Sequence, residues 1–268
     1  MSFRDIVVDA CPKSDIDRTL ERAREMAVEF GAKLTVVSYA WPRTSLVGEV
    51  LVGNAFSVEE QTRAMEDALG ATRNAFDRVF ATKPVEVEWC SGVIEPAAPL
   101  LDHLLAADLH ITSASEGTTC VSPDAAELAL RSGTPVLRLG QNVATSRFPN
   151  VVVAWKDCSQ ARRAVHDALP ILKRADSVTI VGVGDEVSSD RLEAVAEHLR
   201  RHEVTTGHRH VPRSEGDICA DLLTQARREG ASLIVAGVYS RGSFAERVLG
   251  GVTREMLKNT ETSWFMAH

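Results

Sequence analysis

One segment of the sequence combines glycines, an arginine and a hydroxyl in an order that suits phosphate binding. It leaves an apolar stretch at Gly237, passes Ser240 and Arg241, and reaches Gly250-Gly251-Val252-Thr253 at the start of a predicted helix. Glycines let the backbone approach a phosphate, and the first turn of a helix offers free N–H groups at the positive end of its dipole. The spacing is neither GxGxxG nor that of a Walker loop. The segment therefore predicts either an anion site of another type or only a tight strand-to-helix connection.

Four histidines form a second, weaker pattern. His198 and His202 stand four residues apart on a predicted helix, and His208 and His210 alternate along a following stretch. Helical histidines at this spacing can share a metal ion, but the neighbouring arginines would repel a cation. We expect a solvated basic face here rather than a metal site. The sequence also contains no serine in a GxSxG context, so it predicts no serine nucleophile of the hydrolase type.

These residues belong to a chain that repeats itself. The first copy has predicted strands at 5–9, 33–39, 107–112 and 134–139, and helices at 16–30 and 98–105. The same order returns as strands at 150–155, 177–183, 231–237 and 262–266, and helices at 161–172 and 221–226. Apolar strands that alternate with helices predict a parallel sheet covered on both faces, with any ligand crevice at the carboxyl ends of the strands.

The sequence thus predicts an α/β protein of two tandem three-layer α/β/α domains, each with a five-stranded parallel sheet. We place the domains at residues 1–143 and 148–268 and expect a pseudo-twofold relation between them. The closing strands at 135–139 and 263–266 would otherwise leave open sheet edges, so we expect them to pair. A long helical insert at 58–80 distinguishes the first copy, as a packing or dimer helix.

Composition excludes several classes of protein. A chain of 268 residues with 44% hydrophobic and 25% charged residues is typical of globular proteins and not of disordered ones. The net charge of −7 argues against a nucleic-acid or anionic-membrane binder, and its acidic excess lies within residues 1–147. No apolar run is long enough for a membrane span, and five cysteines without a CxxC pair indicate a reducing compartment. We expect a cytoplasmic protein.

The glycine segment resembles the nucleotide loop of the universal stress protein family, which reads Gly-two residues-Gly-nine residues-Gly-Ser/Gly-Val-Thr. In this chain the anchors are Gly237, Ser240 and Gly250-Gly251-Val252-Thr253, with Ser240 replacing the second glycine. The stretch from Val153 to Pro170 is also similar to the second half of tandem bacterial members. The resemblance covers nearly the whole chain.

The resemblance implies the adenine nucleotide alpha hydrolase-like fold and a stress-response sensor or partner-binding module. Such a protein would bind ATP or a related adenine nucleotide in its C-terminal half, with Mg²⁺ if the ligand is ATP. The residues implied to cradle phosphates are Gly237, Ser240, Gly250, Gly251, Val252 and Thr253. Arg241 would neutralise the phosphates, and the backbone at Val183 would lie beside the base. Lys156 stands where members carry Asp or Asn, and a cation there would instead approach phosphate. No general base is evident, so we expect at most slow ATP hydrolysis.

The first copy departs further from the family pattern. Cys11 falls at the position where family members carry Asp, and Asp124 stands where the paired glycines should be. The carboxylate of Asp124 would compete with phosphate for the same N–H donors. We interpret this copy as degenerate. Cys11 and Cys158 follow the first strand of each copy, where a helix N-terminus would lower a thiol pKa; a redox-sensing thiol is a minor alternative to a small residue tolerated in a turn.

Three other functions stay open from the sequence. The first is a ligand-free structural or interaction protein in which both sites have decayed, and the residues Lys156 and Ser240 favour it. The second is a binder of another small phosphorylated ligand. An adenylating ligase is disfavoured, because the sequence lacks an SGGxDS-type pyrophosphatase loop. Protein partners and a homodimer fit any of these functions.

Overall fold

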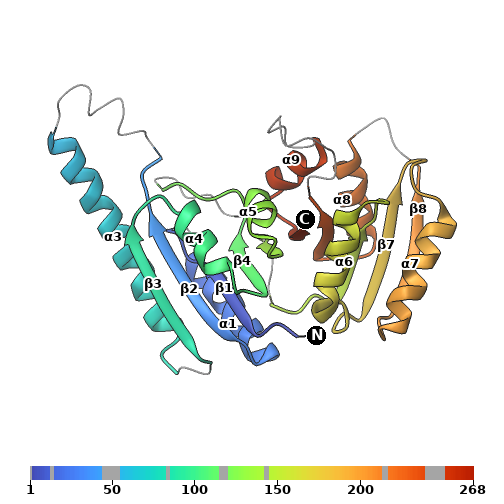
Figure 1. Cartoon of the computed structure of the whole chain (residues 1–268), viewed down its shortest axis with the longest axis horizontal. Helices are drawn as coiled ribbons and strands as arrows, with labels where there is room; N and C mark the ends of the chain where they lie inside the picture. The colour runs from blue at the N-terminus through green and yellow to red at the C-terminus, as the bar shows by residue number, and fades with distance from the viewer. Residues whose placement is uncertain are drawn as a thin grey trace. The chain divides into compact units, whose positions relative to one another are not determined.

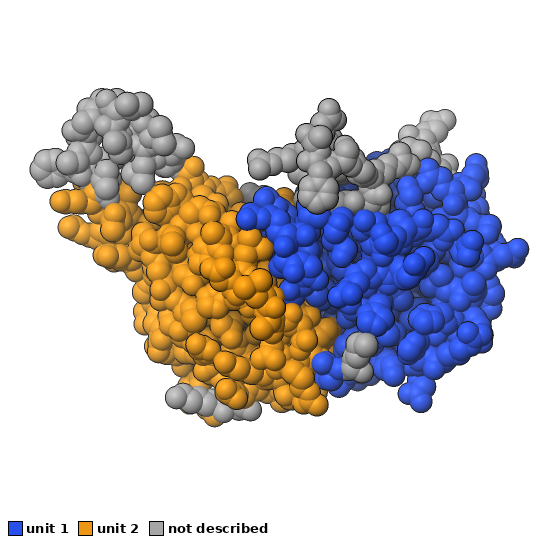
Figure 2. All heavy atoms as spheres, in the orientation of Figure 1, with its two compact units in different colours: residues 1–2, 125–268 blue, residues 3–124 orange. Residues whose placement is uncertain are grey.

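The chain folds into two compact α/β units in which helices alternate with strands (Figure 1). The computed structural model describes residues 2–12, 15–43, 55–82, 85–114, 120–141, 145–212, 217–238 and 251–268. One unit comprises residues 3–124, and the other comprises residues 125–268 with the first two residues of the chain (Figure 2). The helix and strand that close the first sequence copy therefore cluster with the second copy.

The unit of residues 3–124 has a parallel sheet with the strand order β3-β2-β1-β4. Its strands are β1 (Asp5–Asp9), β2 (Lys33–Ala40), β3 (Val87–Val93) and β4 (Leu109–Ser113). Its helices are α1 (Ile16–Phe30), α3 (Ala55–Val79) and α4 (Ala97–Leu104). Gly31 ends α1 in the left-handed region at φ 63°, a conformation that glycine adopts without strain. Buried side chains of β1, β2 and β4 form the centre of this unit.

The unit of residues 125–268 has the strand order β5-β10-β9-β6-β7-β8. Its strands are β5 (Val136–Leu139), β6 (Asn150–Ala154), β7 (Ser177–Val183), β8 (Thr206–Val211), β9 (Leu233–Gly237) and β10 (Ser263–Ala267). Its helices are α5 (Ala125–Ser132), α6 (Ser159–Leu172), α7 (Ser189–Arg201), α8 (Ile218–Arg228) and α9 (Gly251–Lys258). All neighbouring strands from β10 to β8 run parallel.

The expected pairing of the two closing strands is confirmed. β5 and β10 pair antiparallel, with Arg138 opposite Trp264, so neither leaves an open edge towards the other. Arg138 is buried, and its guanidinium donates to the carbonyls of Leu257 at 2.9 Å and Asn259 at 2.8 Å. It thereby satisfies carbonyls at the end of α9, which a helix leaves without intrahelical partners.

The direction in which the chain winds reverses between β6 and β9. From β6 the chain moves outward to β7 and β8, and from β9 it moves the other way to β10. Right-handed crossovers therefore place α6 and α7 on one face of the sheet and α8 and α9 on the other. The strand order of the unit at residues 3–124 reverses in the same way between β1 and β4. Such reversals open a crevice at the carboxyl ends of the two strands. Among the described helices, none is both long enough and apolar enough for a bilayer crossing.

Candidate functional site

Three of the predicted site residues lie along one edge of the sheet, on both sides of the strand reversal. Ala154 of β6 is in register with Ala236 of β9 and with Val181 of β7. Gly237 directly follows Ala236, Lys156 comes two residues after Ala154, and Val183 comes two residues after Val181. All three therefore lie at the carboxyl edge of the sheet. The predicted residues Ser240, Arg241 and Gly250 fall outside the described residues.

Gly237 ends β9 where the strand touches the first turn of α6. A Cβ atom at this position would lie 2.5 Å from the backbone nitrogen of Ala161 and 2.5 Å from the carbonyl carbon of Gln160. Cβ atoms in proteins do not approach backbone atoms this closely, so the packing of β9 against α6 itself requires glycine at this position. This requirement holds whether or not a ligand binds.

Gly251, Val252 and Thr253 form the first turn of α9. Gly251 is exposed, and a Cβ atom there would meet no atom of the described residues within 4 Å, whereas Thr253 is only 5% exposed. Because α9 leads from the carboxyl end of β9 to the start of the parallel strand β10, its N-terminus lies at the same edge as Lys156. The free N–H groups and the dipole of this helix end favour an anion.

Lys156 is already engaged by an acid that the sequence pattern did not reveal. Its Nζ lies 2.7 Å from Oε2 of Glu186, which belongs to the turn after β7. Both side chains are substantially exposed, at 40% and 62%. An exposed pair of this kind contributes only about 0–1 kcal/mol, so an anionic ligand can displace Glu186 from the lysine at small cost.

The equivalent edge of the first copy is occupied by its own side chains. Asp9 is buried at the end of β1, where its two carboxylate oxygens accept from the backbone N–H of Cys11 and the hydroxyl of Thr112, both at 2.9 Å. Next to Thr112, the hydroxyl of Ser113 donates to Oδ1 of Asp15 at 3.1 Å. Side-chain hydrogen bonds thus join β1 and the start of α1 to β4 at the strand reversal.

The two copies also start their first helices differently. Residues 10–15 connect β1 to α1, whereas the shorter stretch 155–158 connects β6 to α6. Cys158 is the half-buried N-cap residue of α6, but Cys11 is buried and precedes the N-cap of α1, which is Asp15. The expectation that both thiols occupy the same place at a helix N-terminus is therefore wrong for Cys11. The longer connection is the reason, because it delays the helix.

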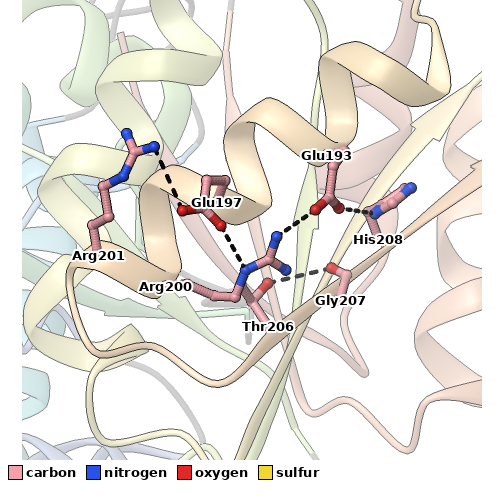
Figure 3. Close-up of polar contacts among 7 residues, drawn as sticks. All are labelled: Glu193, Glu197, Arg200, Arg201, Thr206, Gly207 and His208. Atoms are coloured by element: carbon pink, nitrogen blue, oxygen red, sulfur yellow. Dashed lines mark hydrogen bonds and ion pairs between the residues drawn. The ribbon is translucent and has the colours of Figure 1, made fainter.

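The histidine-rich surface of α7 and β8 is a network of ion pairs (Figure 3). His208 Nδ1 lies 3.0 Å from Oε2 of Glu193, and the guanidinium of Arg200 contacts both Glu193 and Glu197. The rings of His198 and His202 meet edge to face, with centroids 4.7 Å apart. Within the described ranges, no group of three potential ligands could hold a metal ion.

Solved structures of other proteins match the fold of this chain over nearly its whole length. A universal stress protein from Archaeoglobus fulgidus DSM 4304 is 14% identical, covers 97% of this chain and 95% of its own, and has a TM-score of 0.66. A protein of unknown function from Pseudomonas aeruginosa PAO1 is 13% identical, with coverages of 99% and 92% and a TM-score of 0.64. A third structure, from Pseudomonas aeruginosa UCBPP-PA14 and assigned as a universal stress protein, is 14% identical, with coverages of 99% and 93% and a TM-score of 0.63. No family model and no curated protein matches the sequence. The chain has the fold of tandem universal stress proteins.

Proposed function

We propose that this protein is a nucleotide-binding member of the universal stress class and that its C-terminal unit binds ATP or a related adenine nucleotide. In this role it acts as a sensor or partner-binding module whose surface responds to the bound nucleotide. The observation that carries the proposal is the strand reversal between β6 and β9, because open α/β sheets bind ligands in the crevice at such a reversal.

The residues around this crevice have the chemistry that a polyphosphate requires. Lys156 supplies a cation at the end of β6, and Glu186 holds it only weakly because both groups are exposed. The N-terminus of α9 supplies backbone donors at Gly251, where no atom of the described residues would obstruct a ligand within 4 Å of an added Cβ. Arg241 and Ser240, from the same chain segment, complete the proposed phosphate contacts, and the backbone at Val183 is the proposed neighbour of the base.

The proposal assigns one site rather than two. The corresponding crevice between β1 and β4 contains the buried carboxylate of Asp9, which would repel a phosphate and which already binds Thr112. We assign no catalytic residue, and we expect ATP hydrolysis to be slow. Mg²⁺ would arrive with ATP, since the described residues contain no cluster of three ligands that would retain it alone.

A ligand-free interaction protein is the second candidate, and one observation favours it. Gly237 is required for the contact between β9 and α6, so its presence does not need a nucleotide as an explanation. In that case Lys156 would serve only its surface ion pair with Glu186. Another small phosphorylated ligand would use the same α9 N-terminus without a base contact at Val183.

A charge change at Gly251 separates these functions. Gly251→Asp places a carboxylate at the start of α9, where it suits the helix dipole and meets no steric obstacle, but where it repels a phosphate. Gly251→Ala is the matched control, because it adds the same Cβ without charge. We expect ATP and AMP to bind the wild type and the alanine variant in isothermal titration, and the aspartate variant to lose binding while remaining folded.

Three outcomes would contradict the proposal. The first is the absence of ATP and AMP binding below millimolar concentration, together with no co-purifying nucleotide in mass spectra of the released ligand; this outcome selects the ligand-free protein. The second is unchanged affinity in Gly251→Asp, which removes the α9 N-terminus from the site. The third is equal affinity for inorganic pyrophosphate and ATP, which selects a phosphorylated ligand without a base.

A further inference from the structure

A cavity of about 530 Å³ lies between α6 and α7, beside the connection that follows β6. Its apolar lining comes from Val165 of α6 and from Ala194 and Val195 of α7, and both valines are buried. Small-molecule sites in proteins have volumes of roughly 300–1,000 Å³, with apolar walls and few polar groups. The cavity therefore has the size and lining of a site for a small ligand.

A tryptophan whose indole is held by a hydrogen bond lines this cavity. Trp155 lines it from the connection after β6, and the indole Nε1 donates to Oδ1 of Asp157 at 2.9 Å. The other carboxylate oxygen of Asp157 lies 3.3 Å from Nε of Arg191, which also lines the cavity. Asp157 thus orients the indole and neutralises Arg191, so this end offers an aromatic surface without net charge.

The remaining polar lining is cationic or titratable. Arg162 on α6 is exposed and, within the described part of the chain, its guanidinium makes no ion pair or hydrogen bond. His166 lies 3.2 Å from Asp167, and the ring of His198 packs against His202. Among the described residues, Arg162 is therefore the cation of this cavity that a ligand can bind without displacing a carboxylate, although the whole chain carries a net charge of −7.

We propose that the cavity between α6 and α7 binds a small planar aromatic acid. The ring of the ligand stacks on the indole of Trp155 and covers the two valines, and its carboxylate pairs with the guanidinium of Arg162. An arginine fork matches the geometry of a carboxylate and forms charge-assisted hydrogen bonds with it. The lining of this cavity does not include Lys156, Val183, Gly237, Gly251, Val252 or Thr253, although Trp155 and Asp157 flank Lys156 in the chain.

Indole-3-carboxylate is a suitable probe, and its neutral amide, indole-3-carboxamide, tests the role of the charge. Titration of the ¹⁵N-labelled full chain, followed by the indole N–H signals, should move the signal of Trp155 and leave those of Trp41, Trp89 and Trp264 in place. We expect the carboxylate to bind about tenfold or more tightly than the amide, since a hydrogen bond to a charged partner is lost in the amide.

Arg162→Gln should lower the affinity for the carboxylate by about tenfold or more and leave the affinity for the amide unchanged. Lys173→Gln is the matched control, because it removes a cation from the exposed C-terminal end of α6 without touching the cavity. Gly251→Asp should retain wild-type affinity for the probe, which distinguishes this site from the nucleotide site.

Each of the following results would overturn the proposal. Equal affinity for the acid and the amide would show that the ligand carboxylate does not pair with Arg162, and so would an unchanged affinity for the carboxylate in Arg162→Gln. A shift at a tryptophan other than Trp155 would place the probe elsewhere. The absence of binding at millimolar concentration would show that the cavity does not take an aromatic acid.

Discussion

Replacement of Gly237 by alanine tests the central geometric argument about the candidate site. The new Cβ would approach the backbone nitrogen of Ala161 and the carbonyl carbon of Gln160 to 2.5 Å, and neither backbone atom can rotate away. The end of β9 and the first turn of α6 must therefore separate. Gly251→Ala is the matched control, because it adds the same methyl group to a neighbouring element in open space.

The expected size of the effect follows from the two environments. An extra methyl group forced into a packed interior typically costs about 1–3 kcal/mol. Alanine in a helix is instead more stable than glycine by roughly 0.5–1 kcal/mol, with less effect at a helix end. Because about 1 kcal/mol shifts the Tm of a unit of this size by roughly 2–4 °C, Gly237→Ala should melt several degrees below the wild type. Gly251→Ala should melt at or slightly above the wild-type temperature.

Thermal unfolding followed by circular dichroism gives the Tm of both variants. Amide chemical shifts, compared with those of the wild type, show which part of the backbone moves. In Gly237→Ala the backbone signals of the first turn of α6 should shift, and those of α9 should not be the main site of change. Equal melting temperatures for the two variants, with unchanged signals at Gln160 and Ala161, would refute the close contact between β9 and α6.

Three further perturbations probe other parts of the structure. Thr112→Val leaves the buried carboxylate of Asp9 without the hydroxyl that donates to it, and should lower the free energy of unfolding by about 1–3 kcal/mol in urea titrations; a neutral effect would contradict that bond. Burial raises the pKa of Cys219 to about 12, so at pH values near 8 its native thiol should react with Ellman's reagent far more slowly than that of Cys158; equal rates would be contrary evidence. Burial, followed by neighbouring cations, lowers the pKa of His198 below its usual 6.5, so folding favours the neutral ring. Stability should then decline as the pH falls through about 6.5, and urea midpoints at about pH 7.5 and about pH 5.5 should differ less in His198→Gln than in the wild type.

The central strands and their pairing could be predicted from the sequence. Strands β1 and β7 have the bounds that their apolar runs indicated. The pairing of β5 with β10 followed from the need to cover two open edges, and the structure adds that the two strands run antiparallel. In these cases the local pattern and the global fold agree, which is typical of natural sequences.

The edge strands and the polar contacts of the two crevices could not be located in this way. β3 and β8 lie at sheet edges, and the half-exposed or exposed side chains along them produce no apolar run. The bond between Asp9 and Thr112 joins residues 103 positions apart, so no local spacing reveals it. Glu186 is likewise an ordinary surface acid until the fold places it beside Lys156.

The difference between the two copies is more than the identity of single residues. Ser113 ends β4 where Gly237 ends β9, and its side chain fits because the longer connection at residues 10–15 delays the start of α1. Its hydroxyl then binds Asp15, the N-cap of that delayed helix. Exchange of Ser113 for glycine alone would leave the long connection and the buried carboxylate of Asp9 in place. Three coupled features, the residue at the strand end, the length of the turn and the buried acid, therefore distinguish the first copy from the second, which lacks all three.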